Sequence, residues 1–242
     1  MVRCVDCRWR RHPAFKTVDH ETLMQIQSMK RAHQRLAAGT ELIHPGEDVD
    51  VLYTVYAGWI CRYKEIEDGR RQLVGISLPG DLVGMQAAMF DAASYGAFAL
   101  TDVEVCVLPR RRVWELFGDW PELAFDVTWL CAREERFLDE HLTTVGQRTA
   151  VERVAALICG LHDRLAVLGL VDADGGFAFP LRQQHIADAL GLSLVHTNKT
   201  LARLRRLNVL GVSGGRVVVA DAEQLRALAK VAEEERVPRP LI

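Results

Sequence analysis

LRQQHIADALGLSLVHTNKTLARLRRLNVLGVSGG, at residues 181–215, decides the fold of this chain. Apolar residues at helical spacing predict a short helix over Arg182–Leu190, and Gly191 permits the turn that follows it. Ser193 can cap a second helix by accepting a backbone N–H. The valines and glycines that come next predict a hairpin. Two short helices followed by a hairpin are typical of a helix-turn-helix with a wing.

The positive charge of the chain is concentrated in this segment. Between Arg182 and Arg216 there are six basic residues and one acid, Asp188, so the segment carries +5, whereas the whole chain carries −2 and the remainder −7. A local basic patch on a helix-turn-helix favours double-stranded DNA as the partner. A winged-helix module that binds another protein is the alternative.

The predicted second helix has an apolar face and a basic face. The residues expected to point inward are Leu194, Thr197, Leu201 and Leu204. Lys199 is central on the opposite face, where a lysine can donate to guanine O6 or N7 in the major groove. The predicted DNA contacts, to bases or to phosphates, are Arg182, Gln183, Ser193, Val195, His196, Asn198, Lys199, Arg203, Arg206, Ser213 and Arg216.

Length and composition indicate an ordinary globular protein. The chain has 242 residues, 49% of them hydrophobic and 26% charged, which is enough to bury one large or two modest cores. No apolar run is long enough to cross a membrane, and the first residues, MVRCVDCRWRRH, lack the apolar segment of a secretory signal. We therefore expect a cytoplasmic location, and the six cysteines are too few for a disulfide scaffold.

The pattern of apolar residues and glycines in the first half of the chain is typical of β-structure. A short cysteine-bearing arm and a helix over Asp19–Ser28 are expected first. Over residues 36–108, short apolar runs then alternate with glycine turns about every 8–12 residues, which predicts a compact all-β barrel or roll. The last ten residues, EEERVPRPLI, are expected to fray.

A long helix is predicted over residues 121–146, ending near Gly146. Its apolar residues alternate at spacings of four and three, so the helix could pair with a copy of itself. The predicted dimer interface consists of Leu123, Val127, Leu130, Glu134, Phe137, Leu138, His141, Leu142 and Val145. A helix packed only on its own barrel is the alternative. Another helix is expected over residues 149–168.

Together, the glycines of the roll, LPGDLVG, the long helix, RTAVERVAALI and the helix-turn-helix resemble the Crp/Fnr superfamily of bacterial transcription regulators, from Cys4 to about Asp221. The resemblance implies an α+β protein with a cyclic-nucleotide-binding-type, cupin-like β-roll at residues 1–120. It implies a dimerisation helix at 121–146 and a winged helix-turn-helix at 147–242 that reads a palindrome in DNA. It also implies a homodimer and contact with RNA polymerase.

The sequence departs from the members that bind cyclic nucleotides. The glutamate that those members carry after GDLxG is replaced by Met85, and the arginine of their arginine–serine pair is replaced by Ala93, although Ser94 is present. A cyclic phosphate would therefore meet no cation in this segment. Cyclic AMP is not the expected effector. The recognition helix departs as well, with Val195 at the family's glutamate position and Lys199 at its arginine position.

The oxygen-sensing branch of the family holds an iron–sulfur cluster on three N-terminal cysteines and one cysteine of the roll. Cys4, Cys7 and Cys106 match three of these positions, and Pro13 stands at the fourth, beside His12. Histidine replaces cysteine at iron in some clusters, so His12 is a conceivable ligand. The alternative is that Cys4 and Cys7 are a vestigial or redox-active pair and Cys106 is a core residue.

Two other functions compete with a switchable regulator. A cupin-like metalloenzyme would need several histidines inside the roll, whereas residues 36–108 contain only His44. A DNA-bound architectural protein without a switch is compatible with the missing ligand residues. The effector, the target sequence and the direction of regulation stay open.

Overall fold

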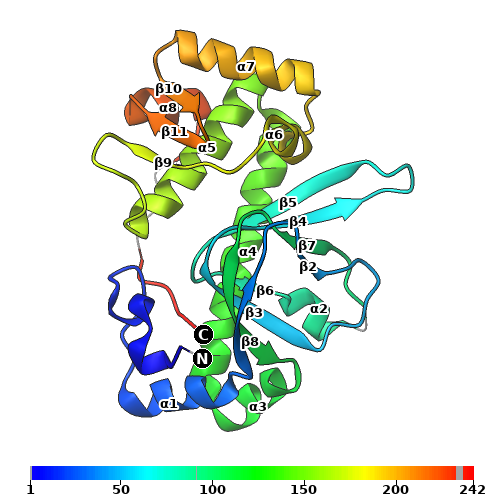
Figure 1. Ribbon diagram of the computed structural model, residues 1–242, viewed down its shortest axis with the longest axis vertical. Coiled ribbons are helices and arrows are strands. Elements are labelled where there is room, and N and C mark those ends of the chain that lie inside the picture. Colours follow the sequence, from blue (N-terminus) through cyan, green and yellow to red (C-terminus); the bar gives the residue numbers. More distant parts are fainter. Residues whose placement is uncertain (1, 91, 233–236) are drawn as a thin grey trace. The chain divides into compact units, whose positions relative to one another are not determined.

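The computed structural model describes residues 2–90, 92–232 and 237–242. It divides the chain into two compact units, each described by itself below: an N-terminal unit, Met1–Phe137 with Val237–Ile242, and a C-terminal unit, Leu138–Arg236 (Figure 1). None of the helices among the described residues combines the length and apolarity needed to cross a membrane. The combination of a β-roll with a helical C-terminal unit confirms the α+β prediction.

The roll of the N-terminal unit consists of two four-stranded antiparallel sheets. One sheet has the order β1 (Ala32–Leu36), β8 (Val103–Pro109), β3 (Val51–Ala57) and β6 (Leu82–Val83). The other has the order β2 (Glu41–Ile43), β7 (Gly96–Ala99), β4 (Ile60–Glu65) and β5 (Arg71–Ser77). A core of fully buried residues that includes Val55, Ile60 and Val105 is shared by strands of both sheets. The β-roll predicted over residues 36–108 is therefore present.

Short helices surround this roll. They are η1 (Cys4–Asp6), η2 (Arg8–Arg11), α1 (His20–Met29), α2 (Met85–Met89), α3 (Arg111–Asp119) and the first part of α4 (Pro121–Gln147). α1 begins where the sequence predicts, because the Asp19 side chain accepts a hydrogen bond of 2.7 Å from the Thr22 backbone N–H. A second core joins α1, α3 and α4 to one sheet through Ile26, Leu52 and Leu116.

The first part of α4 differs from the predicted interface. Leu123, Val127 and Leu130 are 1%, 2% and 7% exposed, and all three belong to the core of their own unit. Glu134 accepts a hydrogen bond from the guanidinium of Arg62 on β4. These four predicted interface residues are therefore engaged inside one chain. The reason is that this half of α4 turns its apolar stripe toward its own roll, as the alternative interpretation expected.

Other apolar residues of α4 remain on the surface. Phe125 is 63% exposed, Leu138 42% and Leu142 69%. Phe137 is partly covered by the guanidinium of Arg133, whose carbon lies 4.5 Å from the ring centroid. His141 and Val145 are half-buried. The part of the predicted interface that stays available is therefore centred on Leu138 and Leu142.

The end of the chain corrects the prediction of a frayed tail. Arg239, Leu241 and Ile242 are buried in the N-terminal unit, and the Ile242 carbonyl accepts a hydrogen bond of 2.7 Å from the buried Thr54 hydroxyl. The Arg239 backbone also pairs with the arm around Phe15. Residues 237–242 are thus a docked strap, whereas residues 233–236 of the predicted frayed segment lie outside the described residues.

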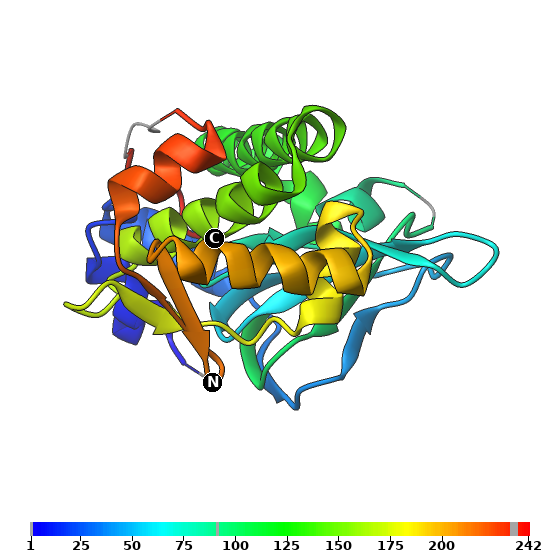
Figure 2. The same ribbon diagram turned by 90° about the horizontal axis from the view of Figure 1, so that it is seen from above.

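The C-terminal unit is built on helices with a small sheet beside them (Figure 2). Its helices after α4 are α5 (Ala150–Val167), α6 (Gln183–Leu190), α7 (Leu194–Arg206) and α8 (Ala222–Ala229). β10 (Leu210–Ser213), β11 (Arg216–Val219) and β9 (Gly176–Ala178) pair in that order as an antiparallel sheet. Thr149 and Glu152 form a capping box at the start of α5. This order of elements matches the predicted winged helix-turn-helix.

Candidate nucleic-acid interface

The turn between α6 and α7 has the predicted chemistry. Gly191 lies in the left-handed region at φ 61°, a conformation that glycine adopts without steric cost. The Ser193 hydroxyl accepts a hydrogen bond of 3.2 Å from the His196 backbone N–H, which confirms the predicted cap of α7. The Arg153 guanidinium of α5 donates to the Leu190 carbonyl at 2.9 Å, so α5 holds the end of α6 in place.

The inward face of α7 is close to the predicted one. Thr197, Leu201 and Leu204 are 0%, 3% and 0% exposed. Leu194, predicted to point inward, is 43% exposed, and Thr200 is buried at 4% instead. The prediction is wrong at Leu194, the first residue of α7, because the buried face begins one turn later, at Thr197.

The helix α7 contains no acidic residue of its own, and its outward face is exposed. Val195 is 64% exposed, and His196, Asn198, Lys199, Arg203 and Arg206 are also exposed. Thirteen residues in a continuous helix present these side chains in one row. An exposed helix with a lysine at its centre and arginines toward its end has the dimensions and the charge to enter a major groove. Contact of these residues with DNA stays a prediction.

Residues on either side of α7 extend this surface. Arg182 and Gln183 at the start of α6, and Ser213 at the end of β10, are exposed as a phosphate contact requires. Arg205 has a different use that sequence reasoning missed. Its guanidinium donates to the Val212 carbonyl at 2.8 Å and so fixes the wing to α7. The sequence gives one sign of this role: Arg205 does not lie on the helix face that carries Lys199 and Arg203.

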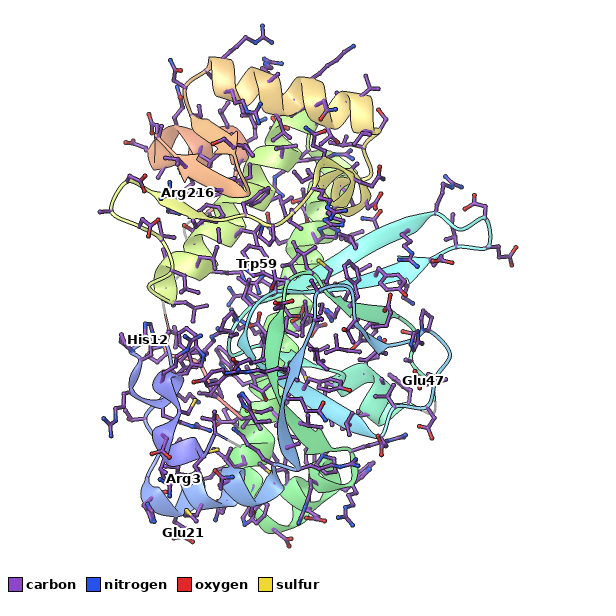
Figure 3. The ribbon with its side chains drawn as sticks, in the orientation of Figure 1. Arg3, His12, Glu21, Glu47, Trp59 and Arg216 are labelled. Atoms are coloured by element: carbon purple, nitrogen blue, oxygen red, sulfur yellow. The ribbon has the colours of Figure 1, made fainter. Side chains whose placement is uncertain are left out.

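Arg216 differs from the predicted phosphate contact. Figure 3 labels this side chain beside the small sheet of the C-terminal unit. Its guanidinium binds the Asp174 carboxylate at 2.8 and 3.1 Å and the Asp172 carboxylate at 2.5 Å. These carboxylates hold the pKa of Arg216 above its ordinary value, and Arg216 in turn lowers the pKa of Asp174. Gly176 makes room for the side chain, since a Cβ there would lie 2.1 Å from the guanidinium. Arg216 therefore ties the wing to the loop before β9.

The segment of the roll that holds a nucleotide in cyclic-nucleotide-binding relatives has other contacts here. Met85 begins α2, Ala93 is buried, and the Ser94 hydroxyl is hydrogen-bonded to Gln86. One cation that the sequence argument missed lies nearby: Arg62 of β4, whose guanidinium carbon is 5.6 Å from the Tyr95 ring centroid. Its charge is already matched, because the same guanidinium donates to Glu134 (see above).

Cys4, Cys7 and Cys106 all lie near Arg10 in the N-terminal unit. All three are buried, and each interacts electrostatically with the buried guanidinium of Arg10. The Lys30 ammonium lies 3.2 Å from the Cys106 sulfur. Burial and the neighbouring thiols outweigh this cation, so the pKa of Cys106 is raised.

The residues present do not fit a metal cluster. Among the described residues, no group of three or more histidine, cysteine, aspartate or glutamate side chains could hold a metal ion. The His12 ring is turned to its own segment, where Nδ1 accepts a hydrogen bond of 3.2 Å from the Ala14 N–H and the ring packs on Trp9 (Figure 3). The space beside Cys106 is taken by Lys30. The metalloenzyme alternative gains no support either, since His44 is exposed.

Comparison with known proteins agrees with both units. The profile described as a cyclic nucleotide-binding domain matches residues 33–119, and the profile described as a Crp-like helix-turn-helix domain matches residues 152–228. The nitrogen fixation regulation protein FixK of Bradyrhizobium diazoefficiens is 31% identical over 93% of this chain and 93% of its own. The transcriptional activator protein FnrL of Cereibacter sphaeroides is 31% identical over 92% and 90%.

A solved structure gives the same result for the fold. The structure of FixK2 from Bradyrhizobium japonicum superposes with a TM-score of 0.75 at 27% identity, covering 84% of this chain and 98% of that one. The similarity therefore spans the roll, the long helix and the winged helix, and not one module alone. The chain belongs to the Crp/Fnr family of transcription regulators and is a DNA-binding protein of that class.

Proposed function

We propose that two copies of this chain bind a palindromic site, each copy inserting α7 into the major groove of one half-site. The observation that carries the proposal is the exposed face of α7, capped at Ser193 and basic from Lys199 onward. A two-fold dimer places its two recognition helices about one turn of DNA, ~34 Å, apart. The site should therefore be an inverted repeat with that spacing.

The position of each side chain on α7 suggests its role. Lys199, at the centre of the exposed face, reads a base edge, and Val195 makes an apolar contact such as that with a thymine methyl. His196 and Asn198 reach base edges or phosphates. Phosphates are contacted by the residues toward the ends of the surface, which are Arg182, Gln183, Ser193, Arg203, Arg206 and Ser213. Arg216 and Arg205 position the wing.

The dimer forms along the exposed stripe of α4. Leu138 and Leu142, four residues apart on one face of the helix, are 42% and 69% exposed, and large apolar residues in contact with water on a long helix favour a partner helix. RNA polymerase is the second protein partner that family membership suggests. Because its DNA partner is chromosomal, we expect the protein to act in the cytoplasm.

The effector is neither cyclic AMP nor an iron–sulfur cluster in this proposal. The basis is Met85 and Ala93 at the nucleotide positions, together with the Lys30 ammonium beside Cys106 and the missing fourth ligand. Purification without oxygen, followed by iron and sulfide assays and an absorbance spectrum, tests whether the protein holds an iron–sulfur cluster. Stoichiometric iron and sulfide would contradict it.

Selection from a random duplex library tests the proposal as a whole. The full-length protein should enrich inverted repeats, and a duplex with both half-sites should bind much more tightly than a duplex with one. Equal affinity for the two duplexes would contradict the dimer, and recovery of no common sequence would contradict base reading by α7.

A further inference from the structure

A groove of about 670 Å³ opens on the N-terminal unit where the end of α1 meets the start of α3. Both helices lie at the foot of the roll in Figure 1. The volume is in the range of pockets that bind small molecules. The residues that give this groove its chemistry are Lys30, Arg31, Arg110, Arg111, Arg112 and Trp114.

The groove is strongly cationic. Five of its lining residues are basic and one, Asp50, is acidic. Arg110 is paired with Asp48 at 2.8 Å, Arg112 with Glu115, and Arg31 with Asp50 at 3.8 Å. Among the described residues, no ion pair or hydrogen bond engages the exposed guanidinium of Arg111. The lining therefore has positive charge that its own carboxylates do not match.

Lys30, which also lines the groove, is the residue that directly follows α1. Its ammonium lies 3.2 Å from the Cys106 sulfur, on β8 of the roll, and no carboxylate among the described residues pairs with it. The Lys30 ammonium is therefore held by the thiols, and the exposed arginines supply the positive charge on which the groove depends.

Trp114 supplies an aromatic surface next to these cations. It is 67% exposed, whereas Val113 and Leu116 of the same helix are 5% and 2% exposed and face the core. The exposed indole and the unpaired guanidinium of Arg111 both line the groove. Indole faces stack well on aromatic rings, and arginines bind phosphates through two parallel hydrogen bonds.

We propose that this groove binds an organic phosphate of nucleotide size, with its anionic groups on Arg110, Arg111 and Arg112 and its aromatic ring on Trp114. The site lies on other elements than the segment at Met85 and Ala93, where relatives hold cyclic nucleotides. It does not rest on the proposed mode of DNA binding, because ligand binding can be measured without DNA.

Isothermal titration calorimetry of the full-length protein tests the proposal with adenosine 5′-diphosphate, inorganic pyrophosphate and adenosine as probes. The diphosphate should bind about tenfold or more tightly than either fragment, since it alone meets both the arginines and the indole. Arg111→Ala should weaken the diphosphate about tenfold. Trp114→Ala should weaken it by a similar factor, about the value of one stacking contact, and leave pyrophosphate unchanged.

Arg35→Ala is the matched control, because Arg35 is an exposed arginine of the same unit outside the groove, with a side chain 83% exposed. It should bind the diphosphate as the wild type does, and circular dichroism should show all three variants folded. Absence of binding at about 1 mM diphosphate, where even a weak site is occupied, would overturn the proposal. Equal affinity for the diphosphate in the wild type, Arg111→Ala and Trp114→Ala would overturn it as well.

Discussion

Two sets of basic side chains, one from each unit, are used in opposite ways. In the C-terminal unit, Lys199, Arg203 and Arg206 lie in a row on the outside of one helix. In the N-terminal unit, Arg133 and Arg239 turn inward to the buried Asp81. In the first arrangement the basic side chains can bind a partner molecule, and in the second they are neutralised by a carboxylate of the same unit. A row of charges that follows the period of one helix can therefore be recognised from the sequence as a binding surface, whereas charges that are paired across the fold cannot be recognised as such.

The buried ion pairs of Asp81 with Arg133 and Arg239 should show the largest effect on stability. Asp81 is 3% exposed, accepts a hydrogen bond of 2.7 Å from the Leu78 N–H, and holds both guanidinium groups. Asp81→Ala leaves these cations buried without a counter-charge, which should lower the free energy of unfolding by about 3–5 kcal/mol. Urea unfolding measures the change. Asp68→Ala, which breaks an exposed pair with Arg70, should cost less than about 1 kcal/mol.

An equal effect for the two substitutions would contradict the comparison, since burial would then make no difference.

The exposed stripe of α4 should show the next largest effect. Leu142→Asp removes a leucine contact worth about 1.5–3 kcal/mol from each copy, so the dimer dissociation constant should rise at least about 100-fold. Sedimentation equilibrium measures it. The control Ile66→Asp changes an apolar residue that is 53% exposed in the turn between β4 and β5, and it should leave the mass unchanged. A dimer that survives Leu142→Asp would place the interface elsewhere.

Loss of a base contact of α7 should cost less free energy than loss of the dimer contact, but its effect should depend on the DNA sequence. Lys199→Ala should cost about 1–3 kcal/mol on the selected site and relax the preference at one base position in each half-site. Competition binding with single-base variants of the site measures both effects. Uniform weakening on every sequence would mean that Lys199 contacts a phosphate.

Substitution of an exposed arginine and of an ion-paired arginine of the C-terminal unit should change the salt dependence of DNA affinity differently. Arg203→Ala should weaken all sequences similarly and reduce the slope of log affinity against log salt by about 1. Arg216→Ala should leave that slope unchanged, because its charge is already matched by Asp172 and Asp174. Fluorescence anisotropy over a salt series measures both variants, and an equal loss of slope would assign Arg216 to the DNA.

The capping box of α5 should give the smallest effect, and one that depends on pH. Hydrogen bonds from Lys230 and then from the Thr149 N–H lower the pKa of Glu152 from 4.5 to about 2. A carboxyl whose pKa is lower in the folded state stabilises the fold above its unfolded pKa, and this contribution disappears as the pH falls toward 2. The difference in unfolding free energy between the wild type and Glu152→Gln should therefore shrink from pH 5 to pH 2. A difference that stays constant over this range would contradict the pKa.

Local patterns in the sequence predicted most of the fold. The cap at Ser193, the turn at Gly191 and the β-roll over residues 36–108 each depend on neighbouring residues or on a short period, and each is present. The failures involve partners far apart in the chain. The tail was expected to fray, yet Ile242 packs in the same core as Cys4 and Leu52. Composition near the chain end carries no sign of such a contact.

The residues of the candidate DNA surface also divide into those whose exposure local sequence predicts and those whose contacts depend on distant residues. Exposure of Lys199 follows from helical periodicity, whereas the fate of Arg216 depends on Asp172 and Asp174, more than 40 positions earlier in the chain. Periodicity also could not say which part of the apolar stripe of α4 faces its own roll. That choice is made by packing, which buries Leu123 and leaves Leu142 exposed. Pairing over long distances thus limits what the sequence can predict about function.

Hydroxyl-radical footprinting on the selected duplex tests most directly whether two chains together present their α7 helices to adjacent turns of DNA. The account predicts two protected stretches related by two-fold symmetry, with centres about 34 Å apart. A single protected stretch on the same duplex at saturating protein would contradict it.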